Sequence, residues 1–535
     1  MTKPLALGFL DTPAAGDTVH PGALTVSGWA LFDGLPASRV EVFLGDHRLG
    51  RALTGIDRAD VAAVHEGPGA AVSGFSLTVD LDEGRPAPGP TRVHALATGV
   101  DGTRLELAHP VRLAAGADPE PEPAPPRTAP LASGPRRGLR TLVCTHQLCL
   151  GGASQYLAET LAALRRLGAI DPVVISPIGG PLRERLEALG IPVHVSGPAP
   201  LHDLEAHDGR VAEISAWAAT QGFELALVNT ASPLTLAGAE AAAVVGLPGI
   251  WVTHETYPPA VLWAGCGPGF EPRLGAALGW ADRVIFQAGE SAALFAPLVS
   301  EERRLTLPYG IDLERIDASR AALDRVAERR RLGLPLDADL LVCLGTVEPR
   351  KAQAALVQAF DLVADQHPRA HLALVGGVDT GHSAAVASWA SACRSAGRIA
   401  VVPTTPDVHS WLGAADLLVC SSRIETLPRA VVEGMAFELP VLATAISGLR
   451  ELIDDGVDGW LCEPGDTVAL AAGLRRALAA GPGERRRIGR AGRDLVERRH
   501  EVGAYARRLA AVLQEAARRP APGGGPQLGP PASVG

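Results

Sequence analysis

The stretch from residue 415 to residue 465 constrains the fold most, because it indicates a strand, a turn, a helix and a second strand in direct succession. It reads ADLLVCSSRIETLPRAVVEGMAFELPVLATAISGLRELIDDGVDGWLCEPG. The apolar run Leu417–Cys420 is typical of a buried parallel strand. The sequence predicts that a helix begins near Thr426, whose hydroxyl can cap it, with Pro428 in its first turn. Val441–Ala445 is then expected to form the next strand.

Two carboxylates flank the start of this predicted helix. Glu425 lies in the preceding turn, and Glu433 lies about 10 Å further along the axis at the usual rise per residue. Because a helix N-terminus offers free N–H groups to an anion, a pyrophosphate there would lie between the two carboxylates. A nucleoside diphosphate sugar has this shape, with hydroxyls at both ends. Taken alone, the two glutamates could equally be solvated charges, since acids are favoured at helix starts.

The whole stretch resembles the E-x7-E signature of the retaining glycosyltransferases of family 4. The resemblance extends through the trailing GLRELIDDGVDGWL, which makes it long and specific. It implies the GT-B architecture, an α/β fold in which two Rossmann-like parallel-sheet domains face a cleft. It also implies transfer of a sugar from a nucleoside diphosphate sugar to a hydroxyl acceptor, with retention at the anomeric carbon.

Length and composition indicate a globular protein of about three domains. The chain has 535 residues, of which 47% are hydrophobic and 20% charged, and its net charge is −10. An acidic balance argues against nucleic acid as a partner. The arginine runs at 485–487 and 498–499 are typical of solvated helix faces, and they leave peripheral contact with a membrane open.

Cysteine usage and the N-terminal residues bear on the compartment. The seven cysteines are odd in number and form no C-x-x-C pair, so neither a disulfide framework nor a zinc site is indicated. The first residues, MTKPLALGFLDTPAAGD, lack the apolar core of a signal peptide. No apolar run is long enough to span a bilayer. We therefore expect a cytoplasmic protein, at most peripheral to the inner face of the membrane.

Residues 1–112 are predicted to form a small all-β sandwich that precedes the Rossmann-like domains. Short runs with strand-like alternation are separated by Gly, Pro and Asp turns, at Ala23–Leu31, Arg39–Gly45, Gly74–Leu81 and Thr91–Thr98. The segments GFLDTP, VSGWAL, GIDRADV and SGFSLTVDL resemble an immunoglobulin-like module found beside some bacterial surface-polysaccharide transferases. Trp29 is expected in its core, and an exposed Trp29 that stacks on a sugar is the alternative. Residues 113–138 form a Pro-rich linker by composition.

From Leu139 onwards, strands alternate with helices, which predicts parallel sheets covered on both faces. One Rossmann-like domain is expected over residues 139–309 and carries the acceptor side. A second, with the donor side and terminal helices, is expected over 310–519, and residues 520–535 are expected to be disordered. Expected strands are 141–147, Pro172–Ser176, Pro192–Ser196, Leu225–Asn229, Gly249–Thr253, Arg283–Gln287, Leu340–Leu344, His371–Val375, Ile399–Pro403, Leu417–Cys420 and Val441–Thr444.

Two further loops follow predicted strands and resemble phosphate-contacting loops of the family. Gly151 and Gly152 open a helix and would let the backbone approach a diphosphate closely. In GTVEPRKAQ, Lys351 matches the family's diphosphate-binding cation, and Arg350 is a second candidate. Many members carry an arginine where this chain has Thr346, which puts one phosphate contact in doubt. A surface pair or a plain tight turn would use the same residues.

His254 follows the strand that ends near Thr253, and Glu255 comes next. A single histidine is more often structural, but this one matches a histidine that in the family approaches the transferred sugar. The segment LPYGID, residues 307–312, resembles the family's interdomain NG[IV]D with Tyr309 in place of Asn. We expect it to be a hinge.

The predicted mechanism needs neither a metal nor a cofactor, since no D-x-D motif follows a strand. Glu425, His254 and Lys351 are the catalytic candidates. The donor is expected to contact Glu433, Arg350, Lys351, Gly151, Gly152 and the helix-start residues Thr426, Leu427 and Pro428. The acceptor is expected to be a carbohydrate or a lipid-linked sugar. Two alternatives remain, namely a non-catalytic sugar-binding or scaffolding protein, and another GT-B enzyme such as a nucleotide-sugar epimerase or a phosphorylase.

Overall fold

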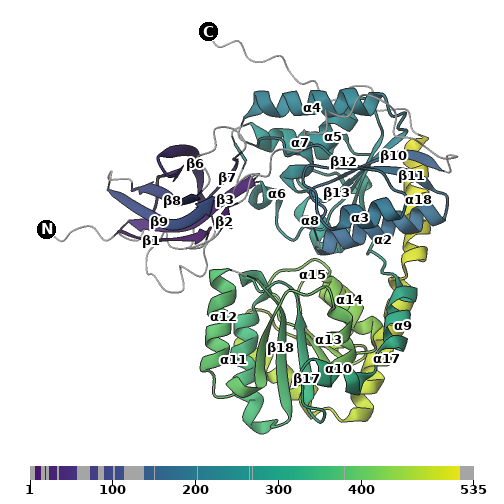
Figure 1. Cartoon of the computed structure of the whole chain (residues 1–535). Helices are drawn as coiled ribbons and strands as arrows, with labels where there is room; N and C mark the ends of the chain where they lie inside the picture. Colours follow the sequence, from purple (N-terminus) through teal and green to yellow (C-terminus); the bar gives the residue numbers. More distant parts are fainter. Residues whose placement is uncertain are drawn as a thin grey trace. The chain divides into compact units, whose positions relative to one another are not determined.

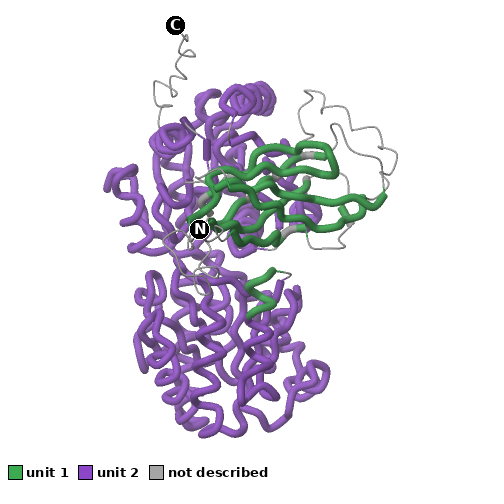
Figure 2. The backbone as a smooth tube through the Cα atoms, turned by 90° about the vertical axis from the view of Figure 1, so that its left-hand side faces the viewer, with its two compact units in different colours: residues 1–127, 379–385 green, residues 128–378, 386–535 purple. Residues whose placement is uncertain are grey.

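The structure is a computed structural model that describes residues 6–13, 18–19, 23–32, 35–56, 73–81, 89–99, 103–113, 138–149, 151–201, 203–263, 266–267, 269–378 and 380–518. It contains two compact units, one of residues 1–127 with 379–385 and the other of residues 128–378 with 386–535 (Figure 2). The predicted Pro-rich linker, apart from Leu113 and Gly138, and the predicted tail lie outside the described residues, so those predictions stay untested.

The first unit contains an antiparallel β-sheet region, as the sequence predicted. Its strands are β1 (Ala6–Thr12), β2 (Thr18–Val19), β3 (Ala23–Phe32), β4 (Leu35–Pro36), β5 (Arg39–Leu44), β6 (His47–Ile56), β7 (Gly74–Asp80), β8 (Gly89–Thr98) and β9 (Arg104–Leu113). They pair in the order β1-β3-β7-β6-β5-β8-β9-β2, with β4 on β3, and only β2 pairs in parallel among these described strands.

Strict alternation builds the core of this unit. Along β5, Val40, Val42 and Leu44 are fully buried while the residues between them face outwards. The runs that the sequence indicated correspond to β3, β5, β7 and β8, whereas β1, β6 and β9 were not predicted. Trp29 is partly buried against Leu31, apart from the main core, so the prediction of a core tryptophan was wrong.

The second unit contains two parallel α/β sheets, which confirms the predicted fold class (Figure 1). The strands of the first sheet are β10 (Leu139–Thr145), β11 (Ile170–Ser176), β12 (Val193–Val195), β13 (Leu225–Asn229), β14 (Gly249–Val252), β15 (Arg283–Phe286) and β16 (Arg304–Thr306), in the order β12-β11-β10-β13-β14-β15-β16. Its helices are α2 (Gly152–Arg166), α3 (Leu182–Ala188), α4 (Leu204–Ala219), α5 (Leu236–Val244), α6 (Pro259–Leu262), α7 (Phe270–Trp280) and α8 (Gly289–Leu294).

The second sheet has the order β19-β18-β17-β20-β21-β22. Its strands are β17 (Asp339–Leu344), β18 (Ala370–Gly377), β19 (Ile399–Pro403), β20 (Leu417–Cys420), β21 (Val441–Thr444) and β22 (Trp460–Cys462). The helices that follow in the chain are α9 (Leu313–Ala322), α10 (Arg325–Arg331), α11 (Gln353–Val363), α12 (Gly381–Ala392), α13 (Val408–Ala414), α14 (Arg429–Ala436), α15 (Ser447–Leu452), α16 (Thr467–Ala479), α17 (Pro482–Arg499) and α18 (Val502–Ala517). Strands β16 and β22 were not predicted.

Helices cover both faces of each sheet because the strands are apolar on both faces. In β10, Val143 packs with α2, whereas its neighbours Leu142 and Cys144 pack with α4 and α5. In β17, Val342 packs with α14 and Leu341 packs with α11. Continuous apolar runs of this kind are typical of parallel strands buried on both sides. All seven cysteines are free, as the sequence predicted.

The chain crosses between the two α/β domains at residues 307–312 and returns at residues 499–502. The N–H of Ile311 donates to the carbonyl of His500 (2.8 Å), and the N–H of Val502 donates to the carbonyl of Ile311 (3.0 Å). Gly310 allows this approach, since a Cβ there would lie 2.6 Å from the Cα of Val502. Helix α17 packs on α14, whereas α18 packs on α2. The predicted hinge segment is thus one of two adjacent crossings.

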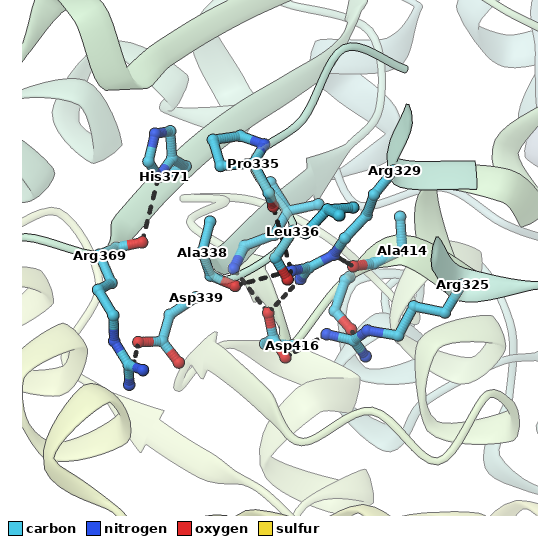
Figure 3. Close-up of polar contacts among 12 residues, drawn as sticks. Arg325, Arg329, Pro335, Leu336, Ala338, Asp339, Arg369, His371, Ala414 and Asp416 are labelled. Atoms are coloured by element: carbon cyan, nitrogen blue, oxygen red, sulfur yellow. Dashed lines mark hydrogen bonds and ion pairs between the residues drawn. The ribbon is translucent and has the colours of Figure 1, made fainter. Parts of the chain in front are cut away.

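The amino-terminal edge of the second sheet is held by a buried arginine (Figure 3). Arg329 on α10 donates to Asp416 Oδ2 (2.6 Å) and to the carbonyls of four residues, Pro335, Leu336, Ala338 and Ala414. Asp416 also accepts a hydrogen bond from the N–H of Leu340 (2.8 Å) and forms an ion pair with Arg325. These contacts fix where β17 and β20 begin, and the opposite edge of the sheet carries the predicted site.

Candidate functional site

Two cations meet Glu425 at the carboxyl edge of the second sheet. Strands β17 and β20 are parallel neighbours, so the loops that follow them lie side by side. Arg350 and Lys351 lie in a short 3-10 turn after β17, and Glu425 lies in the turn after β20. Arg350 Nη1 donates to Glu425 Oε1 (2.8 Å), and Lys351 Nζ pairs with the same oxygen. The structure therefore brings three of the predicted site residues together.

Further hydrogen bonds hold these two loops against each other. The Ser421 hydroxyl donates to the carbonyl of Lys351 (2.8 Å), and the N–H of Arg423 donates to the carbonyl of Arg350 (2.8 Å). Glu425 is only 8% exposed, so its charge is little screened by water. A small pocket adjoins them and is lined by Cys343, Leu344, Lys351, Leu418, Val419, Cys420, Ser421, Ser422, Pro428, Ala430 and Val431.

The helix after Glu425 begins later than the sequence predicted. Helix α14 starts at Arg429, with Pro428 as its N-cap residue, so Thr426 does not cap it. The Thr426 hydroxyl instead lies 3.2 Å and 3.0 Å from the carbonyl oxygens of His254 and Glu255. The Thr426 prediction was wrong because a tertiary contact with the other α/β domain takes the hydroxyl that a cap would use.

The other two helix-start residues also lie before α14. The carbonyl of Leu427 accepts a hydrogen bond from the Tyr309 hydroxyl (3.3 Å). Pro428 was expected inside the first turn, but it precedes that turn, and the N–H of Val431 donates to its carbonyl. The backbone N–H groups of Arg429 and Ala430, in the first turn of α14, therefore have no hydrogen-bond acceptor within the helix.

Glu433 lies one helical turn after Arg429 and pairs with it. Arg429 Nε donates to Glu433 Oε1 (2.8 Å), and both side chains are largely buried. Burial opposes the charge on Arg429, but Glu433 and Glu159 outweigh it and raise the pKa of the guanidinium above its ordinary value. Arg429 is thus a permanent cation beside the predicted donor-binding glutamate.

His254 is held as a neutral base by its surroundings. Its Nε2 lies 2.9 Å from Asn229 Oδ1, and the amide of Asn229 is oriented by donating to Thr145 Oγ1 and to the carbonyl of Ala153. Nε2 must therefore carry the proton, which leaves Nδ1 as an acceptor. Burial, with a smaller contribution from the charge of His146, lowers the pKa of His254 to about 3. A neutral imidazole can accept a hydrogen bond from a hydroxyl group.

Two more titratable groups lie beside His254. Burial raises the pKa of Glu255 to about 7, although its carboxylate accepts the N–H groups of Ala231 and His254, both at 2.7 Å. Burial also lowers the pKa of His146, which follows β10, to about 4. The ring of Tyr156 meets the ring of His254 edge-on, with centroids 4.5 Å apart. Both histidines are therefore neutral near neutral pH, whereas Glu255 gains or loses its proton there.

Gly151 and Gly152 lie where the sequence placed them, at the start of α2. Gly151 is the N-cap residue, and a Cβ on Gly152 would meet no atom within 4 Å. The Ser154 hydroxyl donates to the carbonyl of Gln147 (3.2 Å), which ties the turn to the end of β10. Through Ala153 and Asn229 the turn is connected to His254.

Sequence reasoning missed four residues of this region. Asn229 orients His254, and His146 lies beside it. Glu159 and Arg429 form an ion pair between α2 and α14. The position of His146 and Asn229 at strand ends was a usable signal, because side chains there meet at one edge of a sheet. No sequence signal pointed from Glu159 to Arg429, which are 270 residues apart.

Within the described residues, no group of three or more His, Cys, Asp or Glu side chains could hold a metal ion. None of the helices there has both the length and the apolar composition that a bilayer crossing needs.

Two protein families match consecutive stretches of the chain. Residues 150–315 match the model of Glycosyltransferase Family 4, and residues 324–495 match that of glycosyl transferases group 1. The two matched stretches fall on the two α/β domains of the second unit. The first contains the His254 corner, and the second contains Arg350, Lys351, Glu425 and Glu433.

Curated relatives resemble the chain in sequence, and solved structures resemble it in fold. A D-inositol 3-phosphate glycosyltransferase of Xylanimonas cellulosilytica is 32% identical over 250 residues, which cover 43% of this chain and 59% of that protein. The chain spans about half the length of the curated relatives it matches. A glycosyltransferase of Rickettsia africae (17% identity, TM-score 0.62) covers 71% of this chain, and 99% of its own chain is covered. Anabaena HepE in complex with UDP-glucose (20% identity, TM-score 0.59) covers 70%, and all of its own chain is covered. These structures share the fold.

Proposed function

We propose that this protein is a retaining glycosyltransferase that moves a sugar from a nucleoside diphosphate sugar to a hydroxyl acceptor. The observation that carries the proposal is the convergence of Lys351 and Arg350 on Glu425 at the carboxyl edge of β17 and β20. Ligands of parallel α/β sheets bind at this edge. Two cations there suit the diphosphate of a leaving nucleotide, and relatives are named as glycosyltransferases.

The proposed chemistry assigns a role to each of these side chains. Lys351 and Arg350 offset the negative charge that develops on the departing diphosphate, together with the N–H groups at the start of α14. Glu433 accepts hydrogen bonds from the ribose hydroxyls of the donor. Glu425 binds sugar hydroxyls and orients the transition state.

The proposed step is a front-face displacement. The bond between the anomeric carbon and the phosphate oxygen breaks, the acceptor oxygen bonds to the same face of that carbon, and the leaving phosphate oxygen takes the acceptor's proton. Neutral His254 accepts a hydrogen bond from a hydroxyl of the transferred sugar or of the acceptor. We propose no metal, because Lys351 and Arg350 supply the positive charge.

The proposed acceptor is a carbohydrate or a lipid-linked sugar of the cell surface. Its support is the resemblance of the first 112 residues to a module found beside surface-polysaccharide transferases. We also propose that the protein is cytoplasmic and has at most peripheral contact with a membrane. The nucleotide and the transferred sugar are left open, although a relative of the same fold was solved with UDP-glucose.

Calorimetry tests the proposal. UDP, GDP and ADP, and then their common sugar conjugates, are titrated into the purified protein without metal and again with magnesium. Tight binding of one nucleotide without metal, and loss of that binding in a folded Glu433→Ala variant, are expected. Absence of binding to every nucleotide under both conditions would refute the proposal, and unchanged binding by Glu433→Ala would refute the site.

A further inference from the structure

Four charged side chains form a network between the two α/β domains of the second unit. Arg429 Nη2 lies 2.8 Å from both carboxylate oxygens of Glu159 on α2, and Arg429 Nε donates to Glu433 Oε1 on its own helix at 2.8 Å. Arg315 on α9 donates to Glu159 Oε1 at 2.7 Å. Arg429 thus holds the predicted ribose-binding glutamate of one domain and a glutamate of the other domain at the same time.

Burial makes this network sensitive to any change of partner. The side chain of Glu159 is 2% exposed, and those of Arg429 and Glu433 are 13% and 10% exposed. Arg315 is much more open, with 43% of its side chain exposed. Because buried charges are little screened, a change at Glu159 acts on Arg429, whereas a change at exposed Arg315 has less effect.

The guanidinium of Arg429 has one end without a hydrogen-bond partner. Its Nε is taken by Glu433 and its Nη2 by Glu159, whereas Nη1 is buried and donates to no oxygen of the described residues. Buried donors are nearly always paired, so an unpaired one in a folded protein calls for an explanation. A ligand oxygen that binds beside Glu433 would supply the missing acceptor.

A vicinal diol is the chemistry that fits this pair. A carboxylate accepts hydrogen bonds from hydroxyl groups, and a guanidinium donates to hydroxyl oxygens. Glu433 and Arg429 together can therefore accept from and donate to the two neighbouring hydroxyls of a ribose. Neither residue could serve both functions alone.

We propose that Arg429 binds the ribose diol of the donor together with Glu433, and that Glu159 of the other α/β domain positions Arg429 for it. This rests on the proposed function. Its consequence is that the affinity for the nucleotide depends on Glu159, a residue of the acceptor-side domain that contacts no part of the donor. Engagement of the two domains and recognition of the nucleotide are thereby linked.

The test compares the preferred nucleoside diphosphate with its 2′,3′-dideoxy analogue in calorimetric titrations. The variants are Arg429→Gln, Arg429→Lys and Glu159→Gln, and the matched control is Arg315→Gln, which removes the other partner of Glu159. Circular dichroism and thermal unfolding establish which variants are folded. If Arg429→Gln does not fold, Arg429→Lys and Glu159→Gln carry the test.

We expect Arg429→Gln to bind the ribonucleotide about tenfold more weakly, the loss of one hydrogen bond to a charged group. Glu159→Gln should weaken it several-fold, Arg429→Lys should fall between, and Arg315→Gln should bind as the wild type does. The dideoxy analogue should bind the wild type, Arg429→Gln and Glu159→Gln with equal affinity. Glu159→Gln should add no further loss to Arg429→Gln.

Three results would overturn the inference. If Arg429→Gln lost the same affinity for the ribonucleotide as for its dideoxy analogue, Arg429 would have a structural role only. Wild-type affinity for the ribonucleotide in the folded Glu159→Gln variant would show that nucleotide binding does not depend on Glu159. Wild-type binding of the ribonucleotide by Arg429→Gln would remove the diol contact. A wild-type protein that binds no nucleotide would instead refute the proposed function itself, and this inference with it.

Discussion

Replacement of Glu425 by glutamine is predicted to tighten the binding of a free nucleoside diphosphate. Without a ligand, one oxygen of Glu425 accepts from both Arg350 and Lys351. A diphosphate that binds the same two cations must displace this carboxylate. Glutamine keeps the shape of the side chain but removes its charge, so the competing anion is lost while both cations remain.

The expected gain follows from the contacts that are broken. A hydrogen bond to a charged group contributes about 1.5–3 kcal/mol in mutational series. Glutamine can still accept one weaker hydrogen bond from either cation, so we use the lower part of this range. The lower end, about 1.5 kcal/mol, corresponds to roughly tenfold tighter binding of the diphosphate. Turnover should fall at the same time, because the proposed contact of Glu425 with the sugar is lost.

Isothermal titration calorimetry of the free nucleoside diphosphate measures the effect, with Glu348→Gln as the matched control. The carboxylate of Glu348 lies 2.7 Å from Arg350, but 33% of this side chain is exposed and it forms no ion pair with the Lys351 ammonium group. Since exposed ion pairs contribute little, its variant should bind within about twofold of the wild type. Weaker or unchanged binding by folded Glu425→Gln would refute the idea that Glu425 occupies the diphosphate site.

Three further predictions concern the cation, the histidines and the chain crossing. Lys351→Ala should weaken nucleoside diphosphate binding at least about tenfold, as the loss of one charge-assisted contact requires, and calorimetric affinity equal to that of the wild type would contradict it. The pKa values of His146 and His254 are lowered to about 4 and about 3 in the folded protein. Below about pH 6.5 the unfolded chain therefore binds more protons than the folded protein does. The free energy of unfolding should fall as the pH drops from about 6.5 towards 4, by up to about 1.4 kcal/mol per pH unit for each histidine. In urea titrations His146→Gln should lose less stability over this range, and a slope equal to that of the wild type would be the contrary result. Gly310→Ala should lower the free energy of unfolding by about 1–3 kcal/mol, because its Cβ would lie 2.6 Å from the Cα of Val502. The control Gly279→Ala has open space around its Cβ and should not be destabilised. Thermal unfolding of the two variants tests this prediction, and equal stability of the two would contradict it.

Periodicity and local motifs in the sequence predicted much of the fold. Parallel strands such as β13 and β20 were predicted to the residue, because buried runs of Val, Leu and Ala bounded by turns have few other interpretations. The strands that were missed are short, such as β16 and β22, or carry polar residues, such as β6. Their formation depends on pairing with a neighbour rather than on a local pattern.

The candidate site was predicted in part. The sequence placed Arg350, Lys351 and Glu425 in loops after parallel strands, and the resemblance selected the two cations. That these loops meet follows from the pairing of β17 with β20, which the structure shows. The start of α14 was not predictable, because the Thr426 hydroxyl bonds to carbonyls of the other domain. The pairing of Glu159 with Arg429 depends on how α2 and α14 pack, and no local pattern encodes it.

The most direct test of the central claim is to follow by proton NMR the slow hydrolysis of the nucleotide sugar that the protein binds most tightly. In this reaction water replaces the unidentified acceptor. The account predicts release of the sugar without added metal, first as the anomer that the donor carries, and loss of this release in Lys351→Ala. Release of the opposite anomer first, or release at the wild-type rate by Lys351→Ala, would contradict it.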